Sequence, residues 1–319
     1  MDERKKKVDK VLSSLKGLAM TLNSKPLEVE AISTGSILID DVLGIGGFPR
    51  GRVVELFGSE GAGKSSLCFL TIADLQKKGG IAGYIDAENA IDGEYVRKLG
   101  VQEASFIFSQ PDSGEQGLAV AEKMIEDGNI DLIVIDSVAA LVPKKELEGE
   151  IGDPVIALQA RLMSQALRRL SSKVGKSKVC LVFINQIREN VGVLWGSPEV
   201  TPGGRALKFY ASVRLQVKRK TSVKNDKGVI VGDDVEVKVV KNKVAPPFRS
   251  CRVKMIWGKG YDESEGLVDL ALQKGLVKNP KQGTYILSDG QEVRGREKVI
   301  QFYEDKPELI REMFEGKGE

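Results

Sequence analysis

The sequence predicts an α/β fold in which a mostly parallel, twisted sheet is flanked by helices. Short apolar runs of strand length alternate with helical patterns between residues 33 and 260, which is typical of parallel sheets covered on both faces. A glycine-rich loop between one such run and a helix also favours this fold. The strongest strand candidates are Val53–Phe57, Ala82–Asp86, Ser105–Ser109, Leu132–Asp136, Val179–Asn185 and Val213–Lys218.

Residues 1–31 predict an arm that precedes this core. Residues 27–32 alternate like a strand. Residues 3–22 suit an amphipathic helix, with apolar side chains at Val8, Val11, Leu12, Leu15 and Leu18. A lone helix and strand bury little surface, so we expect the arm to pack either on its own core or on a neighbouring subunit.

We assign residues 32–260 to the core and residues 261–319 to a small α/β domain at the C-terminus. Residues 234–257 indicate further strands joined by a turn at Pro246 and Pro247. Beyond residue 261 the pattern predicts a helix at Leu267–Val277, a strand at Thr284–Leu287, a turn at Asp289 and Gly290, and a helix at Glu297–Phe314 with a break near Pro307.

Composition excludes several classes of protein. The chain has 319 residues, of which 41% are hydrophobic and 29% charged, and its three cysteines are scattered. It therefore predicts neither a disulfide framework nor a cysteine-rich metal site. No apolar run approaches the roughly 20 residues needed to span a bilayer, and we expect a cytoplasmic protein. Because the chain has no histidine, a general base must be a carboxylate.

Residues 58–65 read GSEGAGKS, which matches the phosphate-loop pattern G-x-x-x-x-G-K-S/T at every position. The loop follows a strand candidate and precedes a helical pattern, as this motif requires. Its glycines allow successive N–H groups to face phosphate oxygens. Lys64 is expected to reach the β- and γ-phosphates and the Ser65 hydroxyl to ligate Mg²⁺. The sequence therefore predicts a site for ATP and Mg²⁺.

Polar residues at the ends of three other strands add the chemistry of hydrolysis. Asp136 ends an apolar strand and is expected to hold the water shell of Mg²⁺. Glu88 is the candidate that polarises the attacking water. Gln186 is the candidate sensor of the γ-phosphate. The alternative is that these side chains are ordinary solvated or capping groups at strand ends.

Two loops and one basic helix face indicate contacts to phosphates. The loops span residues 148–153 and 189–205, and loops as long as the second are usually functional or mobile. Helical spacing over residues 157–174 places Arg161 and Arg168 on one face. A solvated helix face would also account for these charges.

The chain resembles the RecA-type DNA strand-exchange ATPases from about residue 31 to the end of the core, and more faintly beyond. The matching segments are ISTGS (32–36), GSEGAGKSS (58–66), YIDAENAID (84–92), SQPDSGEQ (109–116), VIDSVAALVPK (134–144), EGEIGD (148–153), FINQIR (183–188), PGGRALKFYASVR (202–214) and VKVVKNKVAPPF (237–248). The resemblance implies a RecA-type core and a protein of homologous recombination and DNA repair. Such a protein forms a helical filament on single-stranded DNA, pairs it with homologous duplex and promotes strand exchange, with DNA-stimulated hydrolysis of ATP.

The resemblance also implies residue roles. Glu88 matches the catalytic glutamate and Gln186 the glutamine that couples ATP state to DNA binding. Lys241 and Lys243 match lysines that reach across a filament interface to the neighbour's ATP, although alone they would suit exposed charges on an edge strand. The residues that the resemblance implies as nucleotide contacts are Gly58, Ser59, Glu60, Gly61, Ala62, Gly63, Lys64, Ser65, Ser66 and Asp136. Asp92 and Tyr95 match a pair that contacts adenine. DNA contacts fall to Arg161, Arg168, Arg188, Trp195, Gly203, Gly204 and Arg205, in or near loops at residues 148–156 and 187–204.

The sequence departs from the family pattern in four respects, one of which is Arg205, at a position where the family more often has a small or neutral residue. Its N-terminal region is shorter and lacks a basic, glycine-containing segment between helix and strand. Asn89 and Val155 stand where histidines are often found. A long acidic C-terminal tail is absent, which predicts less inhibited capture of duplex DNA by the basic residues nearby. These are Lys274, Lys278, Lys281, Arg294, Arg296 and Lys298.

Two other functions stay open at this point. A ring helicase with a RecA-type core shares the phosphate loop and the strand-end acid, but usually has an extra domain before the core and different pore loops. A nucleotide-switched filament scaffold would need neither Glu88 nor a complete Mg²⁺ site. The sequence also leaves open whether the filament promotes cleavage of a repressor, as in the SOS response to DNA damage.

Overall fold

The computed structural model describes residues 2–15, 19, 29–150, 157–189, 199–306 and 309. The chain divides into two compact units, residues 1–30 and residues 31–319. The first unit contains helix α1 (Asp2–Ser14). Val8 and Val11 on this helix and Leu15 just beyond it are exposed, and they recur at helical spacing. A helix is therefore present over the first part of the predicted range, residues 3–22, and it ends at Ser14, with a turn at Leu15.

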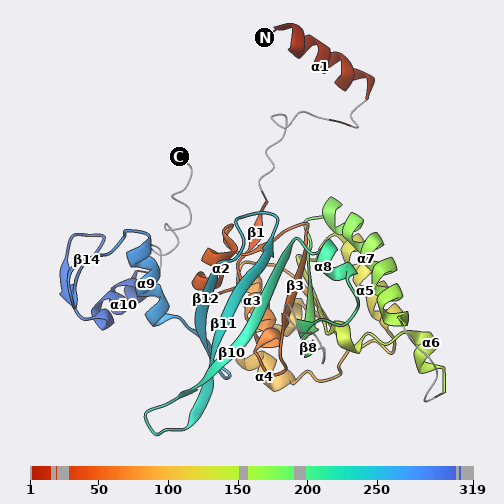
Figure 1. Ribbon diagram of the computed structural model, residues 1–319. Coiled ribbons are helices and arrows are strands. Elements are labelled where there is room, and N and C mark those ends of the chain that lie inside the picture. Colours follow the sequence, from red (N-terminus) through yellow and green to blue (C-terminus); the bar gives the residue numbers. More distant parts are fainter. Residues whose placement is uncertain are drawn as a thin grey trace. The chain divides into compact units, whose positions relative to one another are not determined.

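A nine-stranded sheet forms the centre of the second unit (Figure 1). Its order is β13 (Gly260–Asp262), β12 (Ser250–Ile256), β11 (Ile230–Asn242), β10 (Val213–Lys224), β3 (Val53–Gly58), β7 (Cys180–Gln186), β6 (Leu132–Asp136), β4 (Ala82–Asp86) and β5 (Phe106–Ser109). The strands from β10 to β5 are parallel, whereas β11, β12 and β13 continue antiparallel beyond β10. The predicted α/β fold with a mostly parallel sheet is confirmed.

Helices cover both faces of the parallel part of this sheet, and alternate residues of its central strands pack on different faces. In β6, Leu132 and Val134 belong to one apolar cluster, and Ile133 and Ile135 belong to the other. The first cluster includes residues of α2 (Ile37–Leu43), α3 (Lys64–Lys77) and α4 (Gly93–Lys98), and the second includes residues of α5 (Gly114–Asp127), α7 (Leu158–Lys176) and α8 (Ala206–Tyr210). Burial on both faces explains why the strands read as unbroken apolar runs.

The strand predicted at residues 27–32 appears only at its end. Ala31–Ile32 form β1, which pairs antiparallel with β2 (Phe48–Pro49). Residues 29 and 30 are described but are not part of the strand, and residues 27 and 28 lie outside the described part. A two-residue pairing of this kind fixes the entry of the chain into the core rather than extending the sheet.

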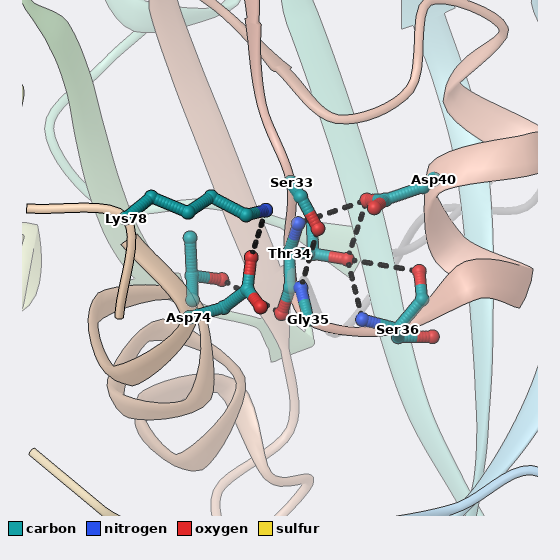
Figure 2. A network of polar contacts seen from close by, with 8 residues as sticks. Ser33, Thr34, Gly35, Ser36, Asp40, Asp74 and Lys78 are labelled. Carbon is teal, nitrogen blue, oxygen red and sulfur yellow. Dashed lines mark hydrogen bonds and ion pairs between the residues drawn. The ribbon is translucent and has the colours of Figure 1, made fainter. Parts of the chain in front are cut away.

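A network of polar contacts joins the segment after β1 to α2 (Figure 2). The backbone N–H and the hydroxyl of Thr34 donate to Asp40 Oδ1 at 2.9 and 2.7 Å. The Ser36 hydroxyl caps α2 by accepting from the N–H of Ile39 at 3.1 Å. The ISTGS segment is therefore a turn that Asp40 holds against the first core helix.

The chain ends in a smaller α/β region with its own apolar cluster. It consists of α9 (Ser264–Gln273), β14 (Lys278–Lys281), β15 (Thr284–Ile286), β16 (Glu292–Arg294) and α10 (Arg296–Asp305). Glu263 joins this region to the core, because its carboxylate accepts from the backbone N–H groups of Ile37 (3.0 Å) and Leu38 (3.3 Å) at the start of α2. Across the described residues, no helix combines the length and apolar character needed to cross a membrane.

Candidate functional site

The phosphate loop connects β3 to α3 at the carboxyl edge of the parallel strands. Gly61 and Gly63 have φ values of 65° and 88°, a conformation that other residues rarely adopt. A Cβ on Gly63 would also lie only 2.7 Å from the Met255 sulfur. The loop thus curls into the N-terminus of a 14-residue helix, where helix geometry favours phosphate.

Lys64 folds back over this loop. Its Nζ donates to the carbonyl oxygens of Gly58 at 3.1 Å and Ser59 at 2.7 Å. The residue is 7% exposed, and burial lowers the pKa of its ammonium, while the negative charges of Asp136 and Glu88 oppose that shift. Since neutral carbonyls are weaker partners than anions for an ammonium group, a phosphate oxygen would replace them favourably.

Ser65 and Asp136, the predicted Mg²⁺ pair, are in contact. The Ser65 hydroxyl donates to Asp136 Oδ2 at 2.6 Å, and the Tyr84 hydroxyl donates to the same oxygen at 2.6 Å. Burial raises the pKa of Asp136, and these two hydrogen bonds act in the opposite direction. The carboxylate is thereby held in one position at the end of β6.

The donor set in this position fits Mg²⁺. Within the ranges that the structure describes, no three acidic, histidine or cysteine side chains converge on a metal position. The Ser65 hydroxyl and the Asp136 carboxylate offer oxygen atoms to a cation, and phosphate and water oxygens would complete its shell. Mg²⁺ suits such a site, because it prefers oxygen ligands and usually keeps several waters.

Glu88 and Gln186 also lie in direct contact. The Gln186 side-chain amide donates to Glu88 Oε1 at 3.0 Å, and the Ser137 hydroxyl donates to the same oxygen. Glu88 follows β4 and Gln186 ends β7, with β6 between these strands. Parallel strands bring their carboxyl ends to one edge of the sheet, so three segments distant in sequence meet beside the phosphate loop.

A cavity of about 220 Å³ opens beside the phosphate loop, and Tyr95 lines it. The Tyr95 hydroxyl lies 3.0 Å from Ser66 Oγ. Asp92 accepts from the N–H groups of Glu94 (2.9 Å) and Tyr95 (3.2 Å) and so caps α4. Of the predicted adenine pair, Tyr95 borders the cavity and Asp92 fixes the helix that carries it.

The opposite wall of this cavity comes from residues that no motif indicates. It consists of Asp233, Val235, Met255 and Trp257, which lie in β11, in β12 and directly after β12. Trp257 is 52% exposed, and its Nε1 donates to Asp233 Oδ2 at 3.3 Å. The sequence signal that could have indicated this wall was a tryptophan at the end of the strands predicted within residues 234–257. Its proximity to the phosphate loop follows from the pairing of β10, β11 and β12 beside β3.

Those residues predicted to bind DNA that the structure describes lie on α7, at the ends of the second loop and directly before α8. Arg161 and Arg168 are exposed on α7, and Arg168 borders a groove of about 470 Å³ between α5 and α7. Arg188 lies in β8 (Arg188–Glu189), which pairs with β9 (Glu199–Val200). That pairing brings the two ends of the second loop together.

The C-terminal end of the second loop is well defined. Gly203 and Gly204 have φ values of 81° and 77°, and exposed Arg205 precedes α8. The first loop follows α6 (Lys144–Leu147). Residues 151–156 and 190–198, with Val155 and Trp195, lie outside the described part, so the predicted role of Trp195 stays a prediction.

Lys241 and Lys243 lie together at the C-terminal end of α8. Lys241 Nζ donates to the carbonyl oxygens of Lys208 at 2.6 Å and Phe209 at 3.1 Å, and Lys243 Nζ donates to that of Phe209 at 3.5 Å. Burial lowers the pKa of Lys241, and the charges of Lys243 and Arg214 add to this effect. Neither lysine borders the cavity beside the phosphate loop.

Known proteins are similar in sequence to this chain over nearly its whole length. A family model described as "RecA N-terminal domain" matches residues 2–262. Protein RecA of Bifidobacterium breve is 50% identical over 98% of this chain and 80% of that protein. Protein RecA of Levilactobacillus brevis is 49% identical over 98% of this chain and 84% of its own length, and Protein RecA 2 of Myxococcus xanthus is 48% identical over 98% and 88%. With a phosphate loop at the carboxyl edge of its sheet, the chain belongs to the RecA family of DNA-dependent ATPases of recombination and repair.

Proposed function

We propose that this chain forms a helical filament on single-stranded DNA, pairs that strand with homologous duplex and promotes strand exchange, with DNA-stimulated hydrolysis of ATP. The contact between Glu88 and Gln186 carries most of the support. Glu88 is the candidate base for hydrolysis, and Gln186 ends β7 shortly before β8 and the second loop. One hydrogen bond of 3.0 Å therefore joins the candidate hydrolytic group to the base of a candidate DNA loop.

In this proposal ATP occupies the cavity beside the phosphate loop. The loop N–H groups and Lys64 hold its phosphates, and the ring of Tyr95 offers a face to the base. Ser65 and Asp136 would hold Mg²⁺, Asp136 through water, and the bound cation would neutralise charge on the phosphates. Lys64 exchanges its carbonyl partners for phosphate oxygens.

Glu88 accepts the proton of the attacking water in this proposal, and Gln186 reports whether the γ-phosphate is present. A phosphate oxygen would compete with Glu88 Oε1 for the Gln186 amide, because charged oxygens are strong acceptors. Displacement of Gln186 would shift β8 and the second loop. Loss of phosphate after hydrolysis lets the amide return to Glu88, which lowers DNA affinity.

Arginines hold the DNA strand mainly by its phosphates. Arg161 and Arg168 on α7 are exposed, and Arg188 and Arg205 flank the second loop. Contacts of this kind are independent of sequence and weaken with salt. Base pairing with an incoming duplex then reads the sequence, and the basic C-terminal region is the proposed site that captures this duplex.

The decisive experiment measures ATP hydrolysis with and without single-stranded DNA and images the same samples by electron microscopy. We expect strong stimulation together with helical filaments. DNA-independent turnover with closed rings would instead indicate a motor of the helicase type. Filaments without turnover would indicate a scaffold.

Glu88→Gln is the matched variant for this experiment. The amide keeps the size of the side chain and its contact to Ser137, but it cannot accept the proton of water. Turnover should fall to background, while ATP-dependent binding of single-stranded DNA persists. Turnover equal to the wild-type rate would remove Glu88 from its proposed role.

A further inference from the structure

The centre of β3 contains a carboxylate that the chemistry above does not use. Glu55 is 0% exposed, three residues before the phosphate loop. A buried carboxylate is costly unless charge and hydrogen bonds compensate it. The partners of Glu55 therefore define which elements it fixes in place.

Glu55 has a different partner on each oxygen. Arg214 Nε in β10 donates to Oε2 at 2.5 Å, and Asn185 Nδ2 in β7 donates to Oε1 at 3.1 Å. The two partners lie on the strands that flank β3 on either side. The Arg214 guanidinium also lies 4.5 Å from the centre of the Phe57 ring, which further limits its movement.

Asn185 connects Glu55 to two parts of the candidate site. Its Nδ2 also donates to the carbonyl oxygen of Pro202 at 3.2 Å, where the second loop ends. Its Oδ1 accepts from the backbone N–H of Gln186 at 3.0 Å. Asn185 is 0% exposed, so water cannot replace these partners. One side chain thus ties the proposed γ-phosphate sensor to the far end of the proposed DNA loop.

Arg214 extends the same network to the lysine pair. It lies opposite Lys241 in the pairing of β10 with β11. The charge of Arg214 lowers the pKa of Lys241 and that of Glu55 raises it, although burial is the largest influence on that lysine. The Glu55 carboxylate is therefore close enough to Lys241 to influence the charge of that lysine.

We propose that Asn185, held by buried Glu55, is a positioning residue that couples nucleotide state at Gln186 to the second DNA loop at Pro202. This inference rests on the proposed function, because it assumes that Gln186 senses the nucleotide and that the loop binds DNA. Asn185 does not touch the nucleotide. It makes the end of β7 and the end of the loop move as one body.

The test replaces Asn185 by alanine in the full-length protein. Two ratios are measured. The first is the rate of ATP turnover in the presence of single-stranded DNA divided by the rate in its absence. The second is the affinity for DNA with a non-hydrolysable ATP analogue bound divided by the affinity with ADP bound. We expect Asn185→Ala to reduce each ratio by about tenfold, within the range of typical coupling between sites. Persistence of both ratios within about twofold of wild type would overturn the proposal.

Gln76→Ala is the matched control. Gln76 is also a buried amide with two backbone partners, since it donates to the carbonyl of Gln102 and accepts from the N–H of Gln102, both at 2.8 Å. It should lower stability like Asn185→Ala but leave both ratios unchanged. An equal loss of both ratios in Gln76→Ala would show that general destabilisation, not positioning, is responsible.

A second pair of variants keeps the test decisive if alanine prevents folding. Asn185→Ser and Gln76→Ser are then compared by the same ratios, with cooperative thermal unfolding as proof of a folded state. The wild-type protein separates the two levels of the argument. Absence of DNA stimulation in wild type contradicts the proposed function, whereas stimulation retained in the Asn185 variant contradicts the positioning role alone.

Discussion

At the scale of single residues, Asp40 makes folding stability depend on pH. Burial raises its pKa to about 7, and hydrogen bonds from Thr34 act against the shift. In the unfolded chain the carboxyl titrates near 3.8. Between these values the folded state binds a proton that the unfolded chain lacks, so the stabilisation is full below pH 4 and is lost as pH rises through 7.

Asp40→Asn should remove this dependence. The Asn oxygen still accepts from Thr34 (Figure 2), but the group no longer titrates. We expect the fall in unfolding free energy between pH 4 and pH 8 to be smaller in the variant by about 2–4 kcal/mol, since one pKa unit corresponds to about 1.4 kcal/mol. Denaturant unfolding at each pH measures the difference. If the unfolding free energy fell equally with pH in the variant and in the wild type, the prediction would be contradicted.

Trp257 is the second residue whose change should be informative. It faces the phosphate-loop cavity opposite Tyr95, where an aromatic ring can pack on a nucleotide base. Trp257→Ala should raise the Kd of ATP about 3–10-fold, because one aromatic contact contributes about 0.5–1.5 kcal/mol. Calorimetric titration measures this change. Trp257→Phe keeps a ring and should stay within about twofold of wild type, and equal binding by the alanine variant would exclude the contact.

At the scale of elements, strands were predicted correctly where burial on both faces produces an unbroken apolar run in the sequence. The strands β3, β4 and β6 are buried along their whole length, as is β7 up to its last residue, Gln186. Their apolar runs predicted all four strands to within one residue at either end. The predicted strand at Val213–Lys218 was too short, because β10 continues to Lys224. Its polar extension is held by pairing with β11, for example by the Arg219–Asp233 ion pair, which no local pattern reveals.

Four of the short strands were not predicted, although β15 (Thr284–Ile286) matches the strand predicted at Thr284–Leu287. β2, β8 and β9 have two residues each and β13 has three, so they show no periodicity. They exist because tertiary contacts bring their partners together. The ends of the second loop were therefore predicted as loop, although β8 and β9 pair there.

The start of α2 supports a prediction about how the C-terminal region is attached. Glu263 accepts two backbone N–H groups there, which is the role of a helix-capping carboxylate. Glu263→Ala should lower the unfolding free energy by about 1–2 kcal/mol, the usual cost of a lost cap. It should also speed amide exchange of Ile37 and Leu38.

Glu265→Ala is the control for this prediction. Glu265 lies in the first turn of α9, two residues after Glu263, but its ion pair with Lys254 is exposed. Exposed ion pairs contribute about 0–1 kcal/mol, and the α2 amides should exchange as in wild type. If both variants lower stability equally, Glu263 does not act through α2.

At the scale of the whole molecule, the sequence motifs predicted where the site lies but not all of the residues that line its cavity. Lys64, Ser65, Glu88, Asp136 and Gln186 converge because parallel strands share one carboxyl edge, a rule that needs only the fold class. Trp257 could not be predicted, because its position depends on the order of β10, β11 and β12. The partners of Glu55 depend on the register of three strands, and register is not visible in a single sequence.

The lysine pair suggests that the active site is completed by assembly. Lys241 and Lys243 are bound to carbonyl oxygens at the end of α8 and do not border the cavity of their own chain. Two positive charges stabilise phosphoryl transfer only where they can approach the γ-phosphate, and a neighbouring molecule can supply them in trans. We therefore expect hydrolysis to require one chain's phosphate loop and another chain's lysines.

Mixing two inactive variants tests this requirement. Glu88→Gln lacks the base but keeps the lysines, whereas Lys241→Ala/Lys243→Ala keeps the base but lacks the lysines. Each alone should be nearly inactive on single-stranded DNA. In a random 1:1 filament about a quarter of the interfaces combine an intact base with intact lysines, so about a quarter of wild-type turnover should return if the charges act in trans. A mixture that stays inactive while electron microscopy shows joint filaments would place the lysines outside the neighbour's active site.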